Sequence, residues 1–81
     1  MYRSGGLYLY LAGYFYRKKG ELENSIEIFQ QVYDCSSQIK QLQIASLYES
    51  GWSFYLLQKW DRAIVYFENF LIGKKKNGGK N

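Results

Sequence analysis

Apolar and small residues recur at helical spacing in four separate stretches of this 81-residue chain. Two stretches step i, i+3, i+4, i+7 through Leu9, Ala12, Gly13 and Tyr16, and through Leu47, Ser50, Gly51 and Phe54. Each precedes a longer stretch of the same period: Leu22, Ser25, Ile26, Phe29, Val32 and Tyr33, and later Trp60, Ala63, Ile64, Phe67, Phe70 and Leu71. The pattern predicts four antiparallel helices joined by short turns. The chain has no proline, which fits an all-α fold.

The second half of the chain repeats the first at an offset of 38 residues, the distance from Leu9 to Leu47. Identical residues meet at four further pairs: Tyr10 and Tyr48, Gly13 and Gly51, Ile26 and Ile64, Phe29 and Phe67. Size or aromatic character recurs at three more: Tyr16 and Phe54, Leu22 and Trp60, Ser25 and Ala63. Self-similarity at this period indicates stacked helical hairpins that bury one another's apolar faces.

Small residues stand opposite large ones in both repeats. Gly13 and Gly51 are predicted where a paired helix approaches closely, and Ser25 and Ala63 are the matching small residues on the second helices. The aromatics at 16 and 54 are expected to lean into that space. This order of large, small, aromatic, alanine-like and aromatic positions is the tetratricopeptide pattern. It predicts two such repeats, at about residues 5–37 and 43–72, forming a short α-solenoid within residues 1–73.

The helix ends have recognisable signals. Gly20 is suited to the left-handed conformation that ends a helix. Glu21, Glu23 and Asp61 place negative charge at the positive starts of the two second helices. Gly73 is predicted to end the fourth helix, because the lysines after it continue no apolar period.

The second repeat resembles a particular group of these proteins. The run Leu47-Tyr48-Glu49-Ser50-Gly51-Trp52, followed by Lys59-Trp60-Asp61-Arg62-Ala63, is similar to the C-terminal region of the tetratricopeptide repeat protein 39 family, which includes fungal inclusion body clearance proteins. The resemblance covers roughly residues 8–72. It implies a piece of a longer array, a scaffolding role linked to lipid handling or aggregate clearance, and no catalytic residue.

An aromatic stripe with a basic end is the candidate binding surface. First helices of such repeats line the concave face of the superhelix. On the sides of these helices that do not face the second helices, the chain carries Tyr10, Tyr14, Arg17, Tyr48, Trp52 and Tyr55. Aromatic and arginine side chains dominate binding hot spots, so a peptide or helix of a partner protein is expected there. Alternatively, these aromatics pack against neighbouring repeats or a second copy of the chain. Both readings predict an interface.

One known groove function is disfavoured. Chaperone adaptors with tetratricopeptide repeats hold a peptide carboxylate with lysine, asparagine and arginine, whereas tyrosines occupy the corresponding places here, at 10 and 14.

The net charge of +4 comes from the C-terminal end alone. Residues 1–73 balance seven cations against seven anions, and Lys74, Lys75, Lys76 and Lys80 supply the excess. With Gly78 and Gly79 close by, residues 74–81 are predicted to form a disordered, flexible tail. Attachment of this tail to an anionic membrane or to nucleic acid is the alternative function, although no nucleic-acid partner is expected.

The composition argues against an enzyme. Histidine is absent and Cys35 is the only cysteine, which removes the common nucleophile arrangements and most metal sites. We expect no catalytic residue, cofactor or metal. A single cysteine indicates a reducing, cytoplasmic setting. The apolar run at residues 7–16 is too short to cross a bilayer, so no transmembrane segment is expected.

Overall fold

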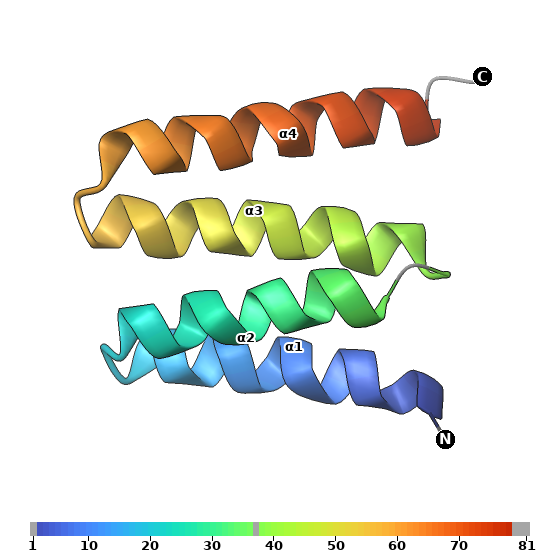
Figure 1. Ribbon diagram of the computed structural model, residues 1–81, viewed down its shortest axis with the longest axis horizontal. Coiled ribbons are helices and arrows are strands. Elements are labelled where there is room, and N and C mark those ends of the chain that lie inside the picture. The colour runs from blue at the N-terminus through green and yellow to red at the C-terminus, as the bar shows by residue number, and fades with distance from the viewer. Residues whose placement is uncertain (1, 37, 79–81) are drawn as a thin grey trace.

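The computed structural model describes residues 2–36 and 38–78, with the side chains of residues 6–36 and 38–76. Over these residues it consists of four α-helices and their connecting turns (Figure 1). The helices are α1 (Tyr2–Lys18), α2 (Leu22–Cys35), α3 (Lys40–Leu56) and α4 (Trp60–Gly78). Successive helices run in opposite directions, as Figure 1 shows. The predicted all-α class with four helices is confirmed.

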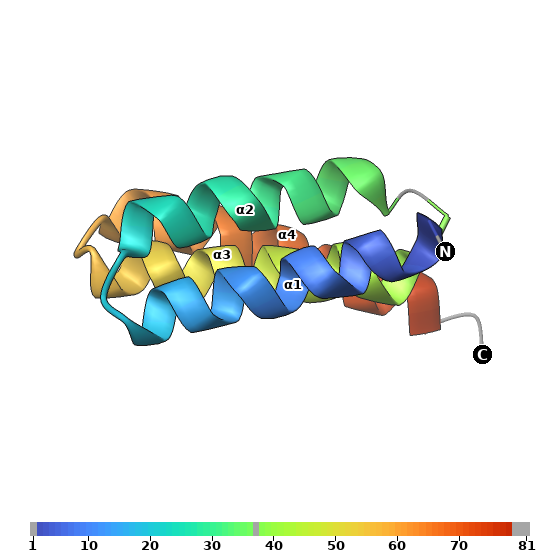
Figure 2. The same ribbon diagram turned by 90° about the horizontal axis from the view of Figure 1, so that it is seen from below.

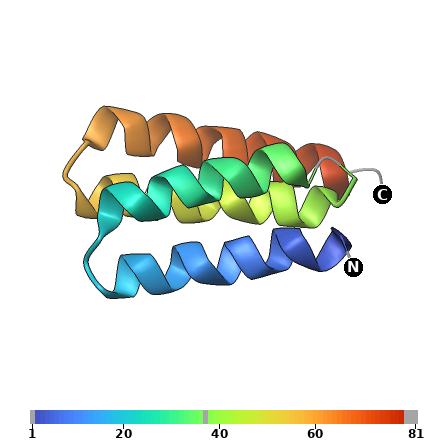
Figure 3. The ribbon, with the colours of Figure 1, turned by 60° about the horizontal axis from the view of Figure 1, so that its bottom comes forward.

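Each helix packs on the next one in the chain. Contacts are extensive between α1 and α2, between α2 and α3, and between α3 and α4, and a smaller contact joins α1 to α3. Figures 2 and 3 show the two hairpins, α1–α2 and α3–α4, lying side by side. Among the described residues, the backbones of α2 and α4 do not approach each other. The predicted solenoid remains a prediction, because two hairpins do not define a superhelix.

The same glycine–phenylalanine contact holds each hairpin together. A Cβ atom on Gly13 would lie 2.8 Å from Phe29 Cε1, and one on Gly51 would lie 2.7 Å from Phe67 Cε1. Real Cβ atoms do not come this close, so only glycine allows each pair of helices its present separation. The two glycines and the two phenylalanines are related by the 38-residue offset.

The core between the hairpins is thin and rich in serine. Phe29 and Val32 are its fully buried apolar residues, and Phe54 and Ala63 are buried in the second hairpin. Ser25 and Ser53 meet across α2 and α3 with their hydroxyl oxygens 2.8 Å apart. Ser25 donates its proton to the carbonyl oxygen of Leu22, so Ser53 is the donor in this pair. Small hydroxyl side chains therefore let α2 and α3 approach closely while their polar atoms stay bonded.

Both hairpin turns have the same backbone conformation. Gly20 has φ +91°, as the sequence predicts, and Gln58, its equivalent at the repeat offset, has φ +64°. In each turn the next amide donates back to the first helix, from Glu21 N to Tyr16 O at 2.9 Å and from Lys59 N to Phe54 O at 3.0 Å. These bonds form a Schellman motif, which ends a helix by satisfying its last carbonyl groups. Glutamine adopts the left-handed region less readily than glycine, so the second turn is the strained one.

The end of α4 differs from the prediction. Gly73 does not stop the helix, which continues through the three lysines to Gly78. Instead, Gly73 lies against α3, where an added Cβ would come 3.2 Å from Ile44 Cγ1. Lysines in a last helical turn interact favourably with the negative end of the helix dipole, which explains the continuation without apolar periodicity. The predicted disordered tail therefore begins, at residue 74, inside a helix, and its residues 79–81 lie outside the described part.

Candidate functional site

The predicted aromatic stripe falls into two parts. On α3, Tyr48, Trp52 and Tyr55 are exposed by 38%, 37% and 46%. Their rings touch in sequence, with centroids 6.2 Å apart from Tyr48 to Trp52 and 5.2 Å apart from Trp52 to Tyr55. Tyr55 then contacts Trp60 at 5.3 Å. Tyr48 and Trp52 also contact Phe67 of α4, with centroids 6.0 and 5.7 Å apart, so the expectation that they face away from the second helix is wrong. These contacts fix each ring, and the exposed parts of the rings form a rigid aromatic surface.

On α1 the stripe residues are more enclosed. Tyr14 is half-buried, and the charged ends of Arg17 and Lys18 each lie 5.5 Å from the centre of its ring. Tyr10 is also half-buried, with its ring edge on Phe29. No aromatic contact between described residues joins Tyr14 to the α3 cluster.

Glu49 connects the two first helices and was not singled out from the sequence. Its Oε1 accepts from Arg17 Nη2 at 2.6 Å, and its Oε2 accepts from Tyr10 Oη at 2.7 Å. Arg17 Nη1 also donates to the Glu49 backbone carbonyl at 3.1 Å. The side chains of Arg17 and Glu49 are each only 12% exposed. The one available signal was that Glu49 is the single acidic residue of α3.

In this network the polar atoms of two stripe residues, Tyr10 and Arg17, are bonded to Glu49 and are not available to a partner. Burial, followed by the hydrogen bond to Glu49, raises the pKa of Tyr10 well above its ordinary value. The phenol therefore stays protonated and continues to donate. Tyr10 and Arg17 stabilise the α1–α3 contact, while the α3 aromatics are the exposed part of the stripe and Tyr14 is half-buried.

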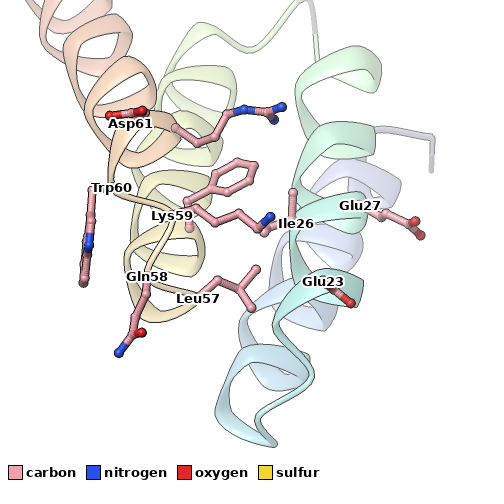
Figure 4. Close-up of a pocket in the computed structure, with 10 residues that line it drawn as sticks. Glu23, Ile26, Glu27, Leu57, Gln58, Lys59, Trp60 and Asp61 are labelled. Carbon is pink, nitrogen blue, oxygen red and sulfur yellow. The ribbon is translucent and has the colours of Figure 1, made fainter.

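Three hollows of the surface lie away from this stripe, between α2 and α4. Three cavities of about 720, 230 and 390 Å³ follow α3 from its C-terminal to its N-terminal end. None of them is lined by a residue of the predicted stripe. The largest is drawn in Figure 4, where the Lys59 side chain extends toward Ile26 while the carboxylates of Glu23 and Glu27 point away.

The outer face of α1 exposes large apolar side chains. Leu7, Tyr8, Leu11 and Phe15 are exposed by 51%, 72%, 46% and 59%. Their equivalents on α3 at the repeat offset are Ala45, Ser46, Glu49 and Ser53, of which the last three are buried. On α4, Ile64 and Leu71 are exposed, as are Val65 and Ile72, which line the cavities between α2 and α4. Both ends of the stack are therefore apolar surfaces.

The described residues hold no group of three or more side chains suited to a metal ion. Cys35 is exposed at the last position of α2. Of the helices described here, none is long and apolar enough to span a membrane.

Two helical hairpins with a repeated glycine–phenylalanine contact define a helical repeat domain of the tetratricopeptide type. The sequence profile of the Iml2/Tetratricopeptide repeat protein 39 family matches residues 1–76. The chain therefore belongs to that family, as its resemblance to it implied. Searches of curated proteins and of solved structures gave no significant match.

Proposed function

We propose that this chain is a protein-interaction scaffold without catalytic activity. The observation that carries the proposal is the rigid, exposed aromatic cluster of Tyr48, Trp52 and Tyr55 on α3. Such side chains bury a large area at a small cost in conformational entropy, which is why they concentrate binding energy at interfaces. Tyr14, with its two adjacent cations, extends this surface onto α1.

The exposed face of α1 supports the same function. At three of the four equivalent positions of α3, the preceding hairpin α1–α2 covers the side chains. Leu7, Tyr8, Leu11 and Phe15 therefore occupy the positions at which a further repeat, or a second copy of the chain, would pack. We assign this face to neighbouring repeats or self-association and the α3 cluster to a peptide partner.

The family resemblance directs the proposal toward lipid handling or aggregate clearance in the cytoplasm. The alternative is peripheral attachment to an anionic membrane or to nucleic acid through the C-terminal lysines. It is favoured by one observation, the exposed Lys74, Lys75 and Lys76 on the last turns of α4. Charge reversal at two of these lysines, together with added salt, abolishes binding if this alternative holds.

Selection from a displayed peptide library tests the scaffold function. Binders of the full chain are expected to lose about tenfold in affinity with Trp52→Ala or Tyr14→Ala, since each removes an aromatic anchor. Gln31→Ala, at an exposed position on α2, is the matched control and should leave affinity unchanged. Binders that are insensitive to both aromatic substitutions, with circular dichroism unchanged, would remove the stripe from the proposal.

A further inference from the structure

A furrow runs along α3 between α2 and α4. Its walls do not touch through their backbones, and the three cavities follow one another along its length. The cavity at the N-terminal end of α3 and the middle one share Tyr33, Leu47 and Asn69 as lining residues. A single bond crosses the furrow among the described residues, from Tyr66 Oη to Gln30 Oε1, and at 3.4 Å it is long and exposed. The furrow is therefore open over most of the length of α3.

Apolar side chains lie along the whole furrow, among polar and charged ones. Ile26, Phe54 and Leu57 line the cavity near the α3–α4 turn. Leu47 and Val65 line the middle, and Ile44 and Ile72 line the other end. Val65 and Ile72 remain about half exposed, so this surface is available for a further apolar contact.

Each end of the furrow carries two cations. Lys59 and Arg62 line the first cavity, and Lys40 and Lys76 line the last. None of the four forms an ion pair with a described residue. The acidic lining residues are confined to the first end, where Glu23, Glu27 and Asp61 outnumber the two cations, and the carboxylates of Glu23 and Glu27 point away from Lys59 (Figure 4).

The end of the furrow that carries Lys40 and Lys76 has a further source of positive potential. No acidic residue lines its cavity. The first turn of α3, which begins at Lys40, holds no acidic residue and no side-chain cap. The positive end of the α3 dipole therefore adds to the charges of Lys40 and Lys76.

From this arrangement we propose that the furrow is a docking site for an acidic amphipathic segment of a partner protein. Apolar side chains of the segment lie on the α3 floor, and its carboxylates reach Lys40 and Lys76 at the end whose cavity has no acidic lining residue. A recessed groove with apolar side chains and one positive end does not match a flat bilayer surface, nor the regular phosphates of a nucleic acid. The inference rests on the proposed interaction function but not on the aromatic stripe, which contributes no residue to the furrow.

The probe is a fluorescein-labelled peptide of about 16 residues with leucine at helical spacing and glutamate elsewhere, compared with the same peptide carrying lysine in place of glutamate. Fluorescence anisotropy with the full chain is expected to show saturable binding of the acidic peptide only. Lys40→Glu combined with Lys76→Glu should weaken it at least tenfold. Lys74→Glu combined with Lys75→Glu changes the net charge equally at exposed positions outside the cavity and should weaken it less than twofold.

Equal weakening by the two double variants would overturn the site, because the binding would then follow net charge alone. Failure of the acidic peptide to bind would also overturn it, as would preferential binding to vesicles containing about 30% anionic lipid. Circular dichroism of each variant verifies the fold. The library peptides of the scaffold test distinguish the failure of this inference from the failure of the proposed function. If those peptides depend on Trp52 while Lys40→Glu combined with Lys76→Glu does not weaken binding of the acidic peptide, only the furrow inference fails.

Discussion

Glu49→Gln tests whether the α1–α3 network stabilises the stacking of the two hairpins. The substitution keeps the shape and one acceptor oxygen but removes the negative charge. Tyr10 and Arg17 then lose a charged partner, and Arg17 is left as an unpaired cation at a site where its side chain is only 12% exposed. Removing one partner of a mostly buried ion pair costs far more than removing an exposed one.

The magnitude follows from two hydrogen bonds. Charge-assisted bonds contribute about 1.5–3 kcal/mol each, and neutral ones about 0.5–1.5 kcal/mol. Glutamine keeps one acceptor oxygen, so one of the two bonds is lost and the other loses its charged acceptor, which together costs about 2 kcal/mol in the free energy of unfolding. For a domain of this size, that loss lowers Tm by about 8–16 °C.

Urea unfolding followed by circular dichroism at 222 nm measures the effect. Glu68→Gln, at an exposed position of α4, is the control and should change the free energy of unfolding by less than about 0.5 kcal/mol. Combining Arg17→Met with Glu49→Leu should recover most of the loss, because no buried charge is then left unpaired. A Glu49→Gln variant as stable as the control would refute this account of the network.

Three further predictions concern single residues. Gln58→Gly should raise the free energy of unfolding by about 1 kcal/mol, because glycine adopts the left-handed conformation of the turn without strain, and urea unfolding that shows no gain would contradict this. Gly51→Leu should abolish cooperative thermal unfolding, since even a Cβ would lie 2.7 Å from Phe67 Cε1, and a normal melting curve would remove the close-contact argument. Burial raises the pKa of Tyr10, so the stability that the protonated phenol contributes is complete below the ordinary pKa of 10.0 and is lost as the pH rises above it. Tyr10→Phe should therefore reduce the loss of stability at alkaline pH in melting experiments. An unchanged pH profile would exclude Tyr10 as the source of that loss.

The repeat made much of the fold predictable. Gly13 and Phe29 recur as Gly51 and Phe67, so a single packing rule describes both hairpins, and the structure shows that contact twice. The Gly20 turn was predictable for the same local reason, since its conformation depends on one residue. The prediction that Gly73 ends the fourth helix was wrong, because a glycine near a helix end can either terminate the helix or allow close approach of another helix. Only the position of Ile44 in the folded chain decides between these two roles.

The candidate sites were less predictable because they depend on contacts between the hairpins. Glu49 replaces an apolar residue, Leu11, at the repeat offset, and nothing local indicates that Arg17 lies within reach of it. The furrow exists because α2 and α4 stand apart across α3. Periodicity assigns a residue to a face of its own helix, but it does not give the separation of two helices that are not neighbours in the chain.

Sedimentation equilibrium of the 81-residue chain over a wide concentration range, with circular dichroism on the same samples, tests most directly whether the fold is built for interaction. We expect a helical chain whose mass rises with concentration, and we expect Leu11→Glu to reduce this association. Glutamate is compatible with the fold at that position, because Glu49 occupies its equivalent on α3. A helical chain that stays monomeric at the highest concentration would contradict the assignment of the exposed α1 face as an interaction surface.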